Sequence, residues 1–112
     1  MVGTDAPNPE VFYGSSLQWE MQSFVEAGLS PIEVLRLATR DAAAAVGAED
    51  LGQLAPGKWA DIVLLDADPL QDIRNAGNIW RVMKAGWVFD PANLAKKPST
   101  KTVEPNQTAV AR

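Results

Sequence analysis

Histidine and cysteine are both absent from the 112 residues of this chain. Histidine is the commonest metal ligand and the usual acid/base group near neutral pH. A Ser-His-Asp triad and a self-contained catalytic zinc site are therefore excluded within the chain, and we expect no metal to be held tightly by this chain alone. The absence of cysteine also excludes disulfides and thiolate metal sites, and it is consistent with a cytoplasmic protein.

Positive charge is scarce as well, with 10 basic against 14 acidic residues and a net charge of −4. Nucleic acids and anionic membranes both require a basic footprint, so we expect neither as the main partner. No apolar run approaches the roughly 20 residues of a membrane span. The first nine residues also lack the basic and apolar regions of a signal peptide.

What is present is typical of a small folded domain: 46% of the residues are hydrophobic and 21% are charged. The pattern predicts a helical part at 1–48, a part built of strands at 49–94 and a flexible tail at 95–112. The tail is polar and has no aromatic residue, so it cannot bury much area.

The helical part begins with MVGTD, which we interpret as the last residues of a strand ending on Asp5. Apolar residues at helical spacing then predict a helix over residues 17–27, with Ser15 or Ser16 as its cap and Gly28 as its stop. The buried face would hold Leu17, Met21, Phe24 and Val25. Charged Glu20 and Glu26 are expected to face solvent.

A second helix is predicted to begin at Pro31, because Ser30 and Glu33 have the spacing of a capping box. Its buried face would hold Val34, Leu35 and Ala38. Residues 39–45 either continue this helix or restart after a kink, with Asp41 as a cap for the restarted helix. Gly47 would end it.

In the third quarter of the chain, the apolar run at 62–65 (IVLL) predicts a strand covered on both faces. It follows a Pro-Gly turn at residues 56–57. Residues 70–78 are expected to form a short irregular or 3₁₀ piece. Residues 79–90 predict a hairpin with a tight turn at 84–86.

Several side chains in this second half have both a chemical and a structural interpretation. Asp61 and Asp66 could form an acid/base pair, but charges that bracket a strand and discourage edge pairing are favoured. Lys58 is interpreted as a solvated turn lysine. Asp66 and Asp68 lack the glycine and distal glutamate of a calcium loop.

The aromatic residues could stack nucleobases, but basic residues among them are few, so burial in a core or an interface is favoured. They are Trp59, Trp80, Trp87 and Phe89.

The order of these signals is familiar: GTD, then VEAGLSPIEVLRLATRDAAAAVG, then LGQLAPGKWADIVLLDADPLQDI, then AGWVF. Over residues 3–90 the chain resembles the C-terminal end of the amidohydrolase superfamily, especially its imidazolonepropionase-like and prolidase-like members. The resemblance implies an α/β fold: the end of a TIM-like (β/α)₈ barrel followed by strands of a small composite β-sandwich.

The resemblance also implies a function. The parent would be a metal-dependent hydrolase of C–N bonds in cyclic amides or dipeptide-like substrates, with zinc the expected divalent metal. Asp5 matches the aspartate that contacts the metal and acts as general base. The family's His-x-His and later histidines are missing here, and Gln18-Trp19-Glu20 stands where the family often has a histidine before a glutamate.

A second hypothesis makes the chain a non-catalytic structural or oligomerisation module derived from that family. Helices and strands separated from a barrel expose apolar faces and strand edges, which drive association. The partner would be the missing N-terminal barrel part or a second copy of the chain.

Overall fold

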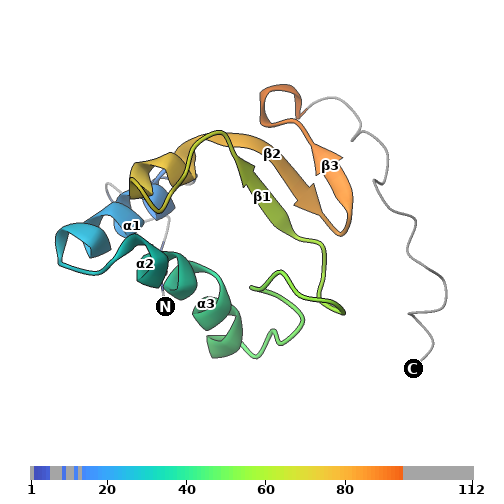
Figure 1. The fold of residues 1–112 in the computed structure, drawn as a ribbon, viewed down its shortest axis with the longest axis horizontal. Helices are drawn as coiled ribbons and strands as arrows, with labels where there is room; N and C mark the ends of the chain where they lie inside the picture. The colour runs from blue at the N-terminus through green and yellow to red at the C-terminus, as the bar shows by residue number, and fades with distance from the viewer. Residues whose placement is uncertain (1, 6–8, 10–11, 13, 95–112) are drawn as a thin grey trace.

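The computed structural model describes residues 2–5, 9, 12 and 14–94, so the predicted tail at 95–112 lies outside the described residues. Figure 1 shows the helices on one side and an antiparallel sheet on the other. The elements in chain order are α1 Ser16–Glu26, α2 Pro31–Ala38, α3 Arg40–Ala45, β1 Ile62–Leu65, the 3₁₀ helix η1 Ile73–Gly77, β2 Ile79–Lys84, β3 Trp87–Phe89 and the 3₁₀ helix η2 Pro91–Asn93.

The predicted ends of α1 and α2 are confirmed, but the prediction that Leu17 lies on the buried face of α1 was wrong, since Leu17 is 44% exposed. Gly28 follows the end of α1 with φ 108°, the left-handed conformation that terminates helices. The Glu33 carboxylate accepts a hydrogen bond from the Ser30 backbone N–H at 2.9 Å, which is the carboxylate half of the predicted capping box. The longest helix in the described part is α1, with 11 residues, and none there could cross a bilayer.

The helix restarts after a kink at Thr39, which has φ −123° and ψ −89°. The Thr39 hydroxyl donates to the Leu35 carbonyl at 2.6 Å, a bond that often accompanies a bend. The prediction of Asp41 as the cap of α3 was wrong. Thr39 holds the cap position, and Asp41 lies in the first turn, 2.7 Å from Arg40 Nε. Gly47, with φ 71°, follows the end of α3 as predicted.

The strand and the hairpin are confirmed, in the sheet order β1-β2-β3. Ala85 and Gly86 have φ 49° and 81°, the two positive values that a type I′ turn requires. A left-handed backbone costs alanine free energy, and two hydrogen bonds that the turn donates to the segment before β1 offset that cost. Asp61 Oδ1 accepts from the Ala85 N–H at 2.7 Å, and the Gly86 N–H donates to the Ala60 carbonyl at 3.1 Å.

Among the described residues, the hydrophobic core lies in the helical layer, which consists of the N-terminal segment, the helices and η1. The buried apolar side chains come from the N-terminal segment, α1, α2 and η1: Val2, Met21, Val34 and Ile73. Val34 is fully buried. After β1 the chain returns to the helices, and η1 packs against α1 (Figure 1).

The sheet, by contrast, is not covered on both faces within the described residues. Val63 is 54% exposed and Leu64 is 36% exposed, so the predicted two-sided burial of β1 was wrong for this chain. Trp59, Trp80 and Trp87 are about half exposed, so they are not buried in a core of the described residues, and the alternative of burial in an interface stays a prediction. The helices pack on η1 and on one another, which leaves the strand faces without a covering layer in this part of the chain.

Candidate functional site

Asp5 ends a short segment, residues 2–5, that is fixed to the helical layer. The Val2 side chain lies in the core, and its N–H donates to the Leu37 carbonyl of α2 at 3.4 Å. Residues 2–5 form no strand in the described part of the chain, so the predicted strand end stays a prediction. A strand needs a neighbouring strand to bond to, and this segment bonds to a helix.

Asp5 itself is exposed and has φ 52°. Aspartate is one of the few residues that adopt the left-handed region at modest cost. Its carboxylate therefore projects from a fixed segment, in a strained backbone conformation of the kind found at functional sites. Such a group could contact a cation or accept a proton.

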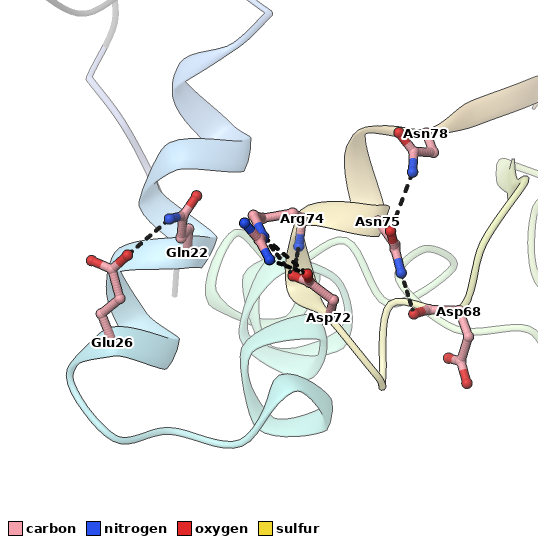
Figure 2. Close-up of polar contacts among 7 residues, drawn as sticks. All are labelled: Gln22, Glu26, Asp68, Asp72, Arg74, Asn75 and Asn78. Carbon is pink, nitrogen blue, oxygen red and sulfur yellow. Dashed lines mark hydrogen bonds and ion pairs between the residues drawn. The ribbon is translucent and has the colours of Figure 1, made fainter.

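Glu20 reaches the same segment from α1. Its Oε1 accepts a hydrogen bond from the Gly3 N–H at 3.0 Å. Its Oε2 is buried and has no hydrogen-bond partner among the described residues. The prediction that Glu20 faces solvent was therefore wrong. The prediction holds for Glu26, which is exposed and accepts from Gln22 Nε2 at 2.8 Å (Figure 2).

The contact of Glu20 with Gly3 was not predicted, because a single helical turn contains residues of both the buried and the exposed face of the helix. Glu20 directly precedes the buried Met21, so it lies at the border of the apolar face rather than opposite it. In the sequence, this position at the border of the apolar face was the signal that Glu20 could contact another segment. The partner in the N-terminal segment could not be identified from spacing alone.

A complete metal site is not found among the described residues, where no three His, Cys, Asp or Glu side chains gather closely enough to hold an ion. A catalytic zinc site takes about three protein ligands. Asp5 could supply one. The residues present therefore do not fit a whole centre, and the expectation that this chain alone binds no metal tightly stays a prediction.

Asp61 and Asp66 are not used as a pair, because each has its own structural surroundings. Asp61 forms an ion pair with Lys84 and accepts from the Ala85 N–H. The Lys84 ammonium, and then the Ala85 N–H, lower the pKa of Asp61. Asp66 is exposed at the end of β1. Lys58 donates to the Glu49 carbonyl, which supports its structural interpretation.

The polar residues after β1 shape a loop, as Figure 2 shows. Asn75 Nδ2 donates to the Asp68 carbonyl at 2.9 Å. The Arg74 backbone N–H donates to Asp72 Oδ1 at 2.9 Å, which caps η1. The Arg74 guanidinium also lies 2.6 Å from Asp72 and lowers the pKa of that carboxyl. These contacts favour a structural role for the acidic residues here.

A cleft of about 670 Å³ lies between the loop after α3 and the hairpin turn. Its lining residues include Glu49, Asp50, Trp59, Asp61 and Lys84. The Lys84–Asp61 ion pair partly neutralises the acidic lining. The cleft does not include Asp5, so the two features are separate candidates.

Three comparisons with known proteins bear on this geometry. The chain is 40% identical over 80 residues to an adenine deaminase of Gluconobacter oxydans, a match that covers 68% of this chain and 14% of that protein. It is 41% identical over 61 residues to an imidazolonepropionase of Streptomyces coelicolor, covering 54% and 16% of the two chains. The second match is to one of the branches that the sequence resembles.

Among solved structures, phenylurea hydrolase B matches with a TM-score of 0.69 and 42% identity, over 82% of this chain and 20% of that one. The chain thus spans less than a fifth of the curated relatives just named. The model of the amidohydrolase family matches residues 1–88. This region holds Asp5, Glu20, the whole helical layer and most of the sheet, and the chain belongs to the amidohydrolase family.

Proposed function

We propose that this chain is the C-terminal part of a metal-dependent hydrolase that cleaves carbon–nitrogen bonds in small amides, with Asp5 as a metal contact and general base. The family match over residues 1–88 is the observation that supports it. Since the chain spans so little of its relatives' length, the rest of a longer protein would supply the other metal ligands and the substrate pocket.

The proposed role of Asp5 is to move a proton. Asp5 and residues of the rest of the longer protein would together hold a divalent metal, with zinc expected, and that metal would make the attacking water more acidic. The Asp5 carboxylate takes a proton from the attacking water while a bond forms between the water oxygen and the amide carbon. It then gives this proton to the nitrogen as the C–N bond breaks, so that an amine leaves.

In the same proposal, residues 2–5 and the helices complete the end of a TIM-like barrel, and β1–β3 belong to a β-sandwich. The register supports the second part: Val63 pairs with Val82 and Trp87 pairs with Lys84, two residues further along β2, so Val63 and Trp87 share one face of the sheet. Both side chains are about half exposed. A sandwich buries such a face against a second sheet.

A chimera tests the proposal. Residues 1–94 replace the matching segment of phenylurea hydrolase B, and hydrolysis of a phenylurea is measured together with metal content. We expect the chimera to be active. Asp5→Asn should lower kcat at least about a hundredfold, as expected for loss of a general base. Asp66→Asn, at an exposed carboxylate of the sheet, is the matched control and should have no effect. An active Asp5→Asn chimera would refute the role of Asp5.

The second candidate, a non-catalytic module, is supported by the exposed apolar face of the sheet. In that case the chain by itself should form oligomers or remain partly molten. Light scattering and thermal unfolding at micromolar concentration test this expectation. A monodisperse monomer that melts cooperatively would argue against it.

A further inference from the structure

We propose that Glu20 is the positioning residue that holds residues 3–5 and thereby fixes the direction in which Asp5 points. Its significance for catalysis rests on the proposed function of Asp5, whereas the contact itself does not. The inference starts from one hydrogen bond between two elements that are distant in sequence: the Gly3 N–H donates to Glu20 Oε1 at 3.0 Å.

The contact is well placed to act on Asp5. Val2 fixes one end of the segment in the core. The Gly3–Glu20 bond is the next attachment along the chain, two residues before Asp5. Glu20 is carried by α1, and the buried side chain of the next residue, Met21, packs that helix in the core. The position of α1 is thus transmitted to the backbone from which Asp5 projects.

The chemistry of Glu20 indicates a purpose beyond stability. A neutral acceptor would satisfy a glycine N–H, yet the chain places a carboxylate here, and in the part that the structure describes its second oxygen is buried without a hydrogen-bond partner. A buried oxygen without a donor costs free energy, so such an atom calls for an explanation. A charged acceptor forms a shorter, stronger bond. The stronger bond would restrict residues 3–5 more tightly, in a segment where Asp5 has a left-handed φ.

NMR of the 112-residue chain tests the inference. In Glu20→Ala, we expect the Gly3 amide to exchange with solvent at least about tenfold faster, as expected for the loss of a hydrogen bond to a charged group. The backbone shifts of residues 3–5 should move toward random-coil values. The methyl signals of Val34 and Ile73 should stay unchanged. Glu20→Gln retains an acceptor oxygen and should restore most of the order in residues 3–5.

Glu26→Gln is the matched control, because Glu26 lies on the same helix but is exposed and bonds only locally to Gln22. It should leave residues 3–5 unchanged. A merely structural role for Glu20 would instead disturb the core methyl signals and lower the melting temperature while residues 3–5 kept their shifts. That pattern, or unchanged Gly3 exchange in Glu20→Ala, would overturn the inference.

The NMR result is independent of the chimera. If residues 3–5 lose order in Glu20→Ala but the Asp5→Asn chimera stays active, the positioning contact stands and the proposed role of Asp5 fails. If Asp5→Asn is inactive but residues 3–5 do not respond to Glu20→Ala, the proposed function stands and the positioning role fails.

Discussion

The helical layer and the sheet have similar apolar sequences, but different interactions stabilise them. In the helical layer, Val34 is fully buried among side chains from four separate segments. In the sheet, Val63 remains 54% exposed, and no residue of the strands is among the buried apolar ones of the described chain. The helices are therefore held by burial, and the sheet mainly by its backbone ladder and the contacts of Asp61 with the hairpin turn. An apolar sequence pattern indicates which side chains would gain from burial, and the rest of the fold determines whether they are buried.

The largest effect is expected in the loop that joins the two regions. At Gly52, with φ 79°, an added Cβ would lie 2.8 Å from Ala43 Cβ and 2.8 Å from the Thr39 carbonyl oxygen. Left-handed strain and overpacking together should lower the free energy of unfolding by about 3 kcal/mol in Gly52→Ala. Gly57 is the control, since it has φ 84° but open space around it. Gly57→Ala should cost only about 1 kcal/mol. Urea unfolding followed by circular dichroism measures both, and equal losses would show that the close contact is not real.

The same substitution in each region tests the comparison directly. Val34→Ala removes two buried methyl groups and should cost about 2 kcal/mol. Val63→Ala, at a half-exposed strand position, should cost less than about 1 kcal/mol. Urea midpoints of the two variants give the answer. If Val63→Ala were as damaging as Val34→Ala, the sheet face would have to be covered in solution, for example by a second copy of the chain.

Acid should affect the hairpin turn before the core. The pKa of Asp61 is lowered in the folded chain, first by Lys84 and then by the Ala85 N–H. The stabilisation by Asp61 is therefore present above the ordinary aspartate pKa of about 3.9 and is lost as the pH falls below it, through the lowered folded value. The Ala85 amide signal should shift in this range, while the Ile73 methyl signals shift less. Asp61→Asn should abolish the pH-dependent shift of the Ala85 amide signal. Asp66→Asn is the control and should preserve this shift. If the shift persists in Asp61→Asn, the titrating group is not Asp61.

The smallest effect is expected for the exposed ion pair beside η1. Arg74 and Asp72 lie 2.6 Å apart, but the Arg74 side chain is 71% exposed. Exposed pairs contribute little, because water and salt screen them. Arg74→Ala should leave the urea midpoint unchanged within error. A clear shift would show that η1 depends on this pair as well as on the buried side chain of Ile73.

Local signals predicted most of the fold. Gly28, the Ser30–Glu33 pair and the run at 62–65 each act within a few residues, so the sequence suffices to place a helix end, a helix start and a strand. The tight turn at Ala85 and Gly86 was also predicted. What the sequence could not show is that Asp61, 24 residues away, bonds to the Ala85 N–H and supports its left-handed backbone.

The candidate site was only half predictable, for the same reason. Asp5 became a candidate only through the family resemblance, and its role stays a prediction, whereas Glu20 was assigned to solvent because its partner, Gly3, is 17 residues away. The exposure of β1 was likewise set by what packs on the sheet rather than by its four apolar residues. Helix and strand type are local properties, while burial and pairing depend on distant parts of the chain.

The return of the chain to the helices at η1 has a consequence for the order of folding. Of the buried core side chains in the described residues, Ile73 is the last to be synthesised, after α1, α2, α3 and β1. The core at residues 2–38 therefore stays open until this residue has left the ribosome and a long loop has closed. Such closure is entropically slow. We expect the helices to form early as fluctuating segments and to lock together only when Ile73 docks, so that a nascent chain stalled before residue 73 would be susceptible to proteases.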